Sequence, residues 1–110
     1  MGRGGYLGEF EQVVLLAVAR LDEDAYGMRI RAEIEERAGR RASIGAVYAT
    51  LERLENKRYL ESWLGEPMPE RGGRPRRYYR VRPAAARALE ESWAALQRMW
   101  QGLEPPMRET

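Results

Sequence analysis

The chain has 110 residues, a formal net charge of +2, 44% hydrophobic residues and 33% charged residues, which predicts one globular domain with a modest core. It contains no cysteine and no histidine, which excludes disulfides, Cys/His zinc sites, thiol nucleophiles and histidine acid–base chemistry. We therefore expect no enzymatic activity, no metal site and no cofactor. No apolar run approaches the roughly 18 residues of a membrane span, and residues 1–10 lack the apolar core of a signal peptide, so we expect a cytoplasmic protein.

Two helices are predicted at the start of the chain. Residues 8–20 are apolar nearly all round, so the first helix is expected to be buried between two layers. A turn follows, in which Asp22 or Asp24 is expected to cap the second helix. That helix spans residues 25–38, and Gly39 ends it as a C-cap. Its buried edge recurs every fourth residue and consists of Tyr26, Ile30 and Ile34.

A third helix is predicted from Ser43, a good N-cap residue, to about Lys57. One face is an apolar stripe, and the opposite face begins with small residues and ends with cations. Small residues allow close approach to another surface, and a helix N-terminus favours phosphate, which suits insertion into a DNA major groove. The alternative is an ordinary exposed helix that tolerates alanine. The buried stripe is Ile44, Val47, Leu51 and Leu54; base contacts are expected from Ser43, Gly45, Ala46, Ala49 and Thr50, and phosphate contacts from Tyr48, Arg53 and Lys57.

An arginine-rich hairpin is predicted after the third helix, with strands at 62–66 and 76–81 around a Gly-Gly loop tip. Residues 71–82 contain six arginines and no acid, so they contribute +6 to a chain charge of +2 and the remaining residues carry −4. A basic hairpin directly after such a helix predicts a winged helix-turn-helix. The alternative is a solvated hairpin. The wing residues expected to contact the DNA backbone or minor groove are Arg74, Arg76 and Arg77.

The last helix, residues 83–103, begins at a proline and carries an apolar seam at heptad spacing. One helix after a small winged domain cannot bury two tryptophans in that core, so we expect the seam to be a dimer interface. The alternative is that this helix folds back on the first helix within the monomer. The predicted interface consists of Phe10, Leu89, Trp93, Leu96, Trp100 and Leu103, with Ala86 starting the seam.

The predicted protein is therefore mainly α-helical with a small β-hairpin. A winged helix-turn-helix DNA-binding domain is expected at 8–82, a C-terminal dimerisation helix at 83–104, and flexible tails at 1–7 and 105–110.

Three segments carry a combined motif, AYGMRIRAEIEE at 25–36, SIGAVYATLERLENKRYLES at 43–62 and GGRPRRYYRV at 72–81. Together they resemble the PadR family of bacterial and archaeal transcriptional regulators, in a single register over residues 8–103. The family pattern has Tyr-Gly near the start of the second helix, a Ser-x-Gly-x-x-Tyr-x-x-Leu-x-x-Leu-Glu recognition helix, and a Gly-Arg wing ending in Tyr-Tyr. The matching positions are Tyr26, Gly27, Ser43, Gly45, Tyr48, Leu51, Leu54, Glu55, Gly72, Gly73, Arg74, Arg77, Tyr78 and Tyr79.

The resemblance implies a homodimeric, sequence-specific regulator that binds double-stranded DNA at a palindromic operator. Two positions depart from the family pattern: Arg58 stands where the family usually carries Gly, and Ala49 where it often has Pro. The alternative function is a winged-helix protein-interaction module without DNA readout, although such a module gives no reason to gather arginines at the wing.

A short chain that ends after one helix resembles the second PadR subfamily, which includes multidrug-binding repressors. The segment Glu91–Ser92–Trp93 stands where a tryptophan of that subfamily faces its symmetry mate and sandwiches flat aromatic ligands. The resemblance thus implies a repressor relieved by a small planar aromatic or hydrophobic effector at the dimer interface. Spacing alone leaves open that Trp93 is only packed core. The implied effector residues are Trp93, Leu89 and Leu96.

Overall fold

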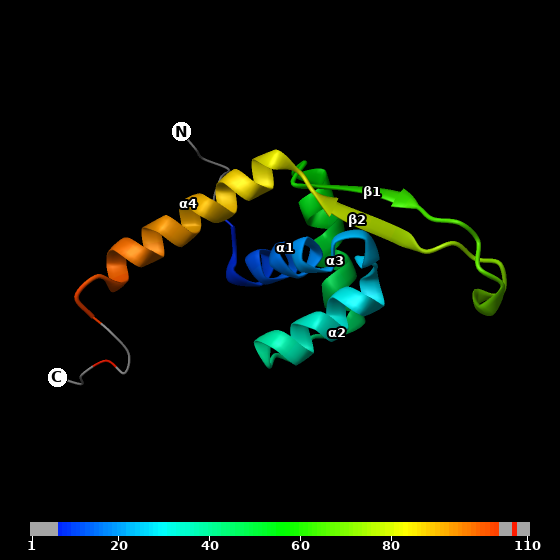
Figure 1. Cartoon of the computed structure of the whole chain (residues 1–110), viewed down its shortest axis with the longest axis horizontal. Helices are drawn as coiled ribbons and strands as arrows, with labels where there is room; N and C mark the ends of the chain where they lie inside the picture. Colours follow the sequence, from blue (N-terminus) through cyan, green and yellow to red (C-terminus); the bar gives the residue numbers. More distant parts are fainter. Residues whose placement is uncertain (1–6, 104–106, 108–110) are drawn as a thin grey trace.

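The computed structural model describes residues 7–103 and residue 107. Three helices form the body, a two-stranded antiparallel hairpin extends from one end, and the last helix extends from the other (Figure 1). The predicted fold, mainly helical with one hairpin, is confirmed. The chain order is α1 (Glu9–Leu21), a 3-10 helix (Asp22–Asp24), α2 (Gly27–Ala38), α3 (Ile44–Asn56), β1 (Leu60–Leu64), a second 3-10 helix (Pro69–Arg71), β2 (Arg77–Val81) and α4 (Pro83–Trp100).

Local capping rules account for most helix ends. Ser43 caps α3 as predicted, since its Oγ accepts a hydrogen bond of 3.0 Å from the Ala46 amide. Gly39 ends α2 in the left-handed region, at φ 63°. The prediction that Asp22 or Asp24 caps α2 is wrong. Both aspartates belong to the intervening 3-10 helix, and α2 begins after Tyr26, which is extended and makes no side-chain cap.

The core lies where α1, α2, α3 and the base of the hairpin meet. Helix α1, expected to be buried between two layers, contacts α2, α3 and β2, but its remaining side faces solvent and Leu16 is 50% exposed. Leu7, which was assigned to a flexible tail, is buried in this core; the other residues of the predicted tails lie outside the described residues, except the exposed Met107. The largest fully buried side chains are Val14, Leu15, Val18, Ile30, Ile34, Val47, Leu51, Leu54 and Leu60.

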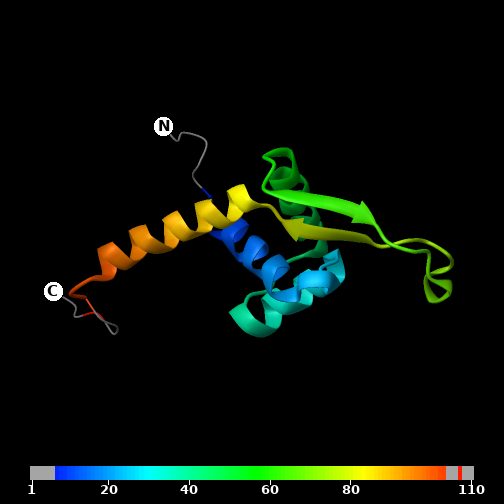
Figure 2. The same cartoon turned by 45° about the horizontal axis from the view of Figure 1, so that its top comes forward.

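The hairpin is anchored to the helical body at its base. The strands pair from Leu60 opposite Val81 to Leu64 opposite Arg77, so β1 begins two residues earlier than predicted. The Tyr79 amide donates to the carbonyl oxygen of Ala25 at 2.9 Å, which ties β2 to the segment before α2. The wing loop therefore projects from a fixed base (Figure 2).

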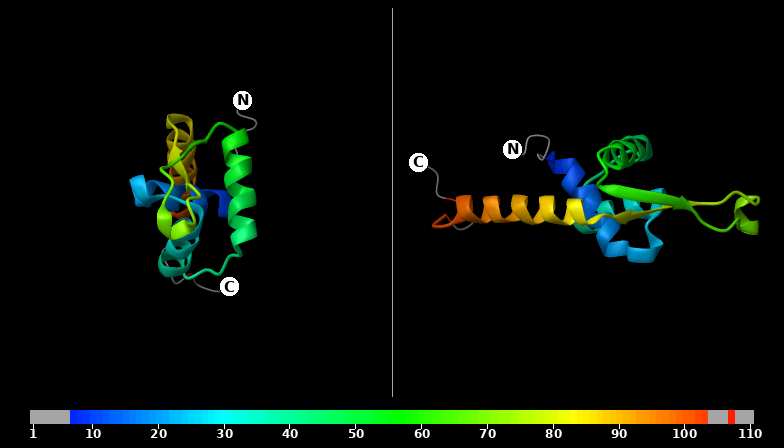
Figure 3. Two further views of the ribbon diagram at one scale, coloured as in Figure 1. Left: turned by 90° about the vertical axis from the view of Figure 1, so that its right-hand side faces the viewer. Right: turned by 90° about the horizontal axis from the view of Figure 1, so that it is seen from above.

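Helix α4 leaves the body after its first turns. Ala85 is fully buried and Leu89 packs partly against the core, whereas Trp93 is 66% exposed. Figure 3 shows α4 and the hairpin extending in opposite directions from the three-helix body, and the molecule measures 58 × 32 × 21 Å along its principal axes. The alternative in which this helix folds back on α1 thus applies only to its first turns. None of the helices in the described residues has the length and apolar character of a membrane span.

Candidate nucleic-acid interface

The outer face of α3 is formed by small residues. Val47, Leu51 and Leu54 point inward and are fully buried, which leaves the opposite face of the helix in solvent. Apart from Tyr48, the exposed residues of the first turns there are small, so another surface can approach the backbone closely beside that ring. The exposed predicted residues of this face are Ser43, Gly45, Ala46, Tyr48 and Ala49.

Thr50 departs from the predicted base contacts. It is only 3% exposed, because it lies on the flank of the buried stripe, three residues after Val47 and four before Leu54. Its Oγ1 accepts a hydrogen bond of 3.3 Å from Arg53 Nη2. Thr50 therefore restrains the partly exposed side chain of Arg53, and its own burial contradicts the prediction that it contacts a base.

Tyr48 lies on the start of α2, where a glycine makes room for its ring. A Cβ placed on Gly27 would lie 2.6 Å from Tyr48 Cε1, a distance that no side chain tolerates without displacement. The Tyr48 residue is still 46% exposed. The Tyr26–Gly27 motif thus has a physical reason: the glycine seats the tyrosine of α3 in one place at the surface.

Arg53 and Lys57, predicted to contact phosphate, both pair with a carboxylate inside the protein. Glu11 of α1 accepts hydrogen bonds of 3.0 Å from Arg53 Nε and 3.0 Å from Lys57 Nζ. Its side chain is 8% exposed, while those of Arg53 and Lys57 are 51% and 36% exposed. Burial raises the pKa of Glu11, but bonds from the Gly8 amide, Lys57 and Arg53 outweigh it and hold the pKa below its ordinary value. Sequence reasoning missed Glu11, whose signal was an acid inside an apolar helix.

The wing arginines differ in their surroundings. Arg74 and Arg77 are exposed, and Arg77 Nη1 donates to Ser62 Oγ at 2.9 Å. Arg76 is half-buried, with its guanidinium carbon 4.0 Å from the centre of the Tyr26 ring. Its buried Nε has no hydrogen-bond partner among the described residues. Arg76 therefore packs on Tyr26, unlike the exposed Arg74 and Arg77, and its contact with the DNA backbone stays a prediction.

Aromatic and cationic side chains form a continuous stack along the hairpin. Tyr26 meets Tyr78 edge-on with ring centres 5.8 Å apart, and Trp63 stacks on Tyr78 at 6.1 Å. Arg80 lies 5.0 Å above the Trp63 ring and donates to Glu61 Oε2 at 2.8 Å. This stack joins the wing to the start of α2 and fixes the orientation of the hairpin. It depends on strand register, so the sequence alone did not reveal it.

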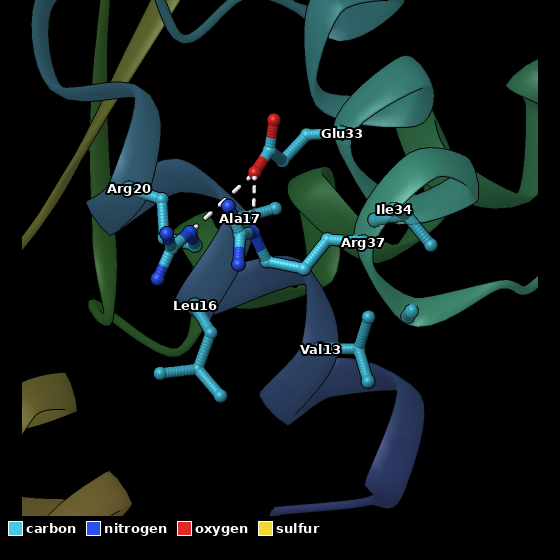
Figure 4. A pocket seen from close by; sticks show the side chains of 8 residues that line it. Val13, Leu16, Ala17, Arg20, Glu33, Ile34 and Arg37 are labelled. Atoms are coloured by element: carbon cyan, nitrogen blue, oxygen red, sulfur yellow. Dashed lines mark hydrogen bonds and ion pairs between the residues drawn. The ribbon is translucent and has the colours of Figure 1, made fainter.

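A hollow between α1 and α2 lies away from the exposed face of α3 and from the wing. Its floor is apolar and includes Leu16 and Ile34. On its rim, Glu33 lies between Arg20 Nε at 3.4 Å and Arg37 Nε at 3.1 Å (Figure 4). Hydrogen bonding from Arg37 lowers the pKa of Glu33. The described part of the chain holds no group of acidic side chains arranged for a metal ion.

The three-helix body, the exposed face of α3 with its small residues, and the hairpin that follows it together form a winged helix. Residues 15–91 match the family described as the transcriptional regulator PadR-like family. The chain belongs to this family. The solved structure of a PadR-like transcription factor from Bacteroides fragilis is similar, with a TM-score of 0.72, 25% identity and 84% of each chain covered. A PadR family transcriptional regulator from Eggerthella lenta DSM 2243 has a TM-score of 0.67 and 27% identity, over 86% of this chain and 81% of that one.

The chain is also 32% identical over 92 residues to an uncharacterized protein of Lysinibacillus sphaericus, covering 79% of this chain and 80% of the relative. PadR-like regulators bind DNA, so this PadR-like protein is a DNA-binding transcriptional regulator.

The departure of this PadR-like chain at Arg58 has a conformational meaning. Arg58 has φ 66°, in the left-handed region that favours glycine. Its amide donates to the carbonyl oxygen of Glu55 at 2.9 Å, and the next amide, of Tyr59, donates to Leu54 at 2.9 Å. The turn that ends α3 is therefore formed with arginine in place of glycine.

The residues predicted for the dimer interface and effector site divide into two groups. Phe10 and Leu89 pack partly against the core. Trp93 and Leu96 are 66% and 56% exposed, so neither belongs to the core of a single chain. The exposed apolar side chains of α4 and the residues after it, named here the α4 face, are Trp93, Leu96, Met99, Trp100 and Leu103.

Proposed function

We propose that this PadR-like regulator is a homodimeric repressor. Two copies joined through α4 read a palindromic operator with α3 and the wing, and a small planar aromatic or hydrophobic effector at the dimer interface releases the operator. The observation that carries the proposal is the α4 face, which one chain leaves exposed to water.

The size of the α4 face supports a dimer. Its five members are between 42% and 74% exposed. At roughly 200 Å² for a large free side chain, they expose roughly 600 Å² of mainly apolar surface, which is at the upper end of patches on monomeric proteins. Two such faces bury roughly 1,200 Å², the lower end of stable protein interfaces. The heptad spacing gives each face the periodicity of a helix pair.

Two parts of the protein support DNA binding: the exposed face of α3 and the wing. The exposed small residues of α3 permit close approach to base edges in the major groove. Arg74 and Arg77 of the wing are exposed cations available to phosphate. In a two-fold dimer these elements occur twice, so the operator is expected to contain two inverted half-sites about 34–36 Å apart, or a multiple of that distance.

Trp93 supports an effector site between subunits. It lies on the α4 face with two-thirds of its surface exposed, and a flat aromatic ring offers a stacking surface for planar molecules. Leu89 and Leu96, one turn before and after it on the seam, supply apolar walls. Because the recognition helices are carried by subunits that meet at this helix, a ligand inserted here changes their separation.

Selection of bound sequences from a random duplex pool tests the operator prediction. We expect enrichment of a palindrome and a dimer mass by light scattering. Ala49→Glu places an acid on the exposed face of α3, so it should abolish operator binding while the circular dichroism spectrum is retained. Enrichment of a single unrepeated half-site, or operator binding by Ala49→Glu at the parent's affinity, would contradict this part.

A titration with planar aromatic dyes tests the effector prediction. Dye binding should quench tryptophan fluorescence and release labelled operator at the same dye concentrations. Trp93→Ala should remain dimeric and hold its operator, but lose this response. If a broad panel of planar dyes leaves both fluorescence and operator binding unchanged, the chain is a repressor without such an effector.

A further inference from the structure

We propose that Glu11 is a positioning residue for DNA recognition: its carboxylate holds Arg53 and Lys57 of α3, and thereby sets the ratio of operator affinity to random-DNA affinity. The inference rests on the proposed role of α3 as the reader of DNA. Glu11 itself lies on α1 and is not expected to touch DNA.

The carboxylate joins the start of α1 to the C-terminal end of α3. Glu11 Oε1 accepts a hydrogen bond from the Gly8 amide at 3.0 Å, which fixes the start of α1. Oε2 accepts from Arg53 Nε and Lys57 Nζ, both at 3.0 Å, and Lys57 Nζ also reaches Oε1 at 3.3 Å. Arg53 is bound again by Thr50. Both cations of the C-terminal half of α3 are therefore held from the same buried point.

The neighbours of Glu11 hold the other end of α3. Glu9 forms an ion pair with Arg40, in the loop that leads into α3. The Arg40 guanidinium carbon also lies 5.1 Å from the centre of the Phe10 ring. The first turn of α1 thus contacts the loop before α3 through Glu9 and Phe10, and the C-terminal end of α3 through Glu11.

A buried acid beside the DNA-binding face has a selective effect on affinity. Random-DNA binding comes almost entirely from cations that neutralise phosphates, and Glu11 offsets one of the two positive charges that Arg53 and Lys57 supply. Operator binding requires base contacts at a defined helix position. Glu11 restrains the cations of α3, which lowers the affinity for random DNA. It also fixes the position of α3, which supports the affinity for the operator.

Glu11→Gln tests this inference. The amide keeps the size of the side chain and can still accept from Gly8, but it cannot hold two cations as a carboxylate does. Random-DNA affinity should rise, and its log–log salt slope should steepen by up to about 0.9 for each newly neutralised phosphate. Operator affinity should not rise with it, so that the ratio falls at least tenfold.

Three further variants separate the position of the Glu11 carboxylate from its charge. Glu23→Gln makes the same change of charge in the 3-10 helix before α2, where Glu23 is exposed and has no ion pair among the described residues; it should leave the ratio at the parent's value. Glu11→Asp keeps the charge but shortens its reach, so it should lower the ratio as well. In an Arg53→Met/Lys57→Met background, adding Glu11→Gln should leave the ratio unchanged.

Several results would overturn the inference. A Glu11→Gln protein whose two affinities rise together, as in the Glu23 control, shows a general charge effect. Affinities that fall together in proportion to the folded fraction show a purely structural role. A parent protein without any sequence preference overturns both this inference and the proposed function, whereas a preference that survives both Glu11 variants overturns this inference alone.

Discussion

The α4 face makes dimerisation testable by one added charge. Leu96 lies between Trp93 and Trp100 on the seam, and in a single chain it is 56% exposed. Leu96→Glu therefore removes no packing from the core of one subunit, and leucine and glutamate have similar helix propensities. The folded monomer should survive, and the change should act only where two α4 faces meet.

The magnitude follows from the symmetry of the interface. Burying an unpaired carboxylate costs several kcal/mol, and a two-fold dimer buries two of them. At about 3 kcal/mol each the dimer loses about 6 kcal/mol, and each 1.4 kcal/mol changes a dissociation constant tenfold. The dimer dissociation constant should rise about 10⁴-fold, which makes the protein monomeric at micromolar concentrations.

The assay pairs light scattering with operator binding by fluorescence anisotropy. Leu96→Glu should show a monomer mass, a thermal midpoint that no longer depends on protein concentration, and a loss of operator affinity, although every residue of the DNA-binding face is intact. Ala95→Glu is the matched control, since it adds the same charge at an exposed position away from the seam. A Leu96→Glu protein that remains dimeric, or a parent that is monomeric at tens of micromolar, refutes the reasoning.

Three further predictions concern the wing, the seat of Tyr48 and acid stability. Arg74→Ala and Arg77→Ala should each reduce the log–log slope of DNA affinity against salt by about 2 in a dimer. Arg76→Ala should instead lower the thermal midpoint and leave this slope unchanged. If Arg76→Ala reduces the slope and the other two variants do not, Arg76 is the phosphate contact and the other two are not. Gly27→Ala should weaken operator binding by displacing Tyr48, with little change in urea midpoint, and added Tyr48→Ala should cause no further loss. Because folding lowers the pKa of Glu11 from 4.5, its stabilisation is present above pH 4.5 and lost as the pH falls below it, so the urea midpoints of parent and Glu11→Gln should converge in acid.

The sequence predicted the elements whose causes are local. The N-cap at Ser43 and the C-cap at Gly39 follow from residue types that satisfy or end a helix within a few positions. The exposed seam of α4 was visible because its spacing repeats within one helix. These features need no knowledge of what packs against them.

The errors lie where a distant segment decides the outcome. Thr50 stands on the flank of a helix, and its burial depends on what packs against that flank of α3. Arg76 was grouped with its neighbours by charge, but the bridge between Tyr26 and Tyr78 brings it onto the Tyr26 ring. Glu11 lies 42 positions before Arg53, so periodicity along either helix could not reveal their pairing.

The junction between the hairpin and α4 shows how the proposed effector could act on DNA. A single residue, Arg82, separates β2 from α4; its amide donates to Tyr59 at 3.0 Å, and its guanidinium lies 3.6 Å from Glu61. The first turns of α4 are packed on the core through Ala85. The helix therefore cannot turn independently of the wing, and a change in its crossing angle rotates the whole DNA-binding unit.

The elongated shape amplifies such a rotation. A rotation of about 10°, similar in size to subunit rotations in allosteric proteins, moves a point at half of the 58 Å extent by about 5 Å. A displacement of that size on each side of the two-fold axis is large against the fixed spacing of half-sites on DNA. In the proposed dimer, a ligand at Trp93 thus needs to favour only a modest change in the crossing angle of two α4 helices to move both recognition helices out of register with the proposed operator.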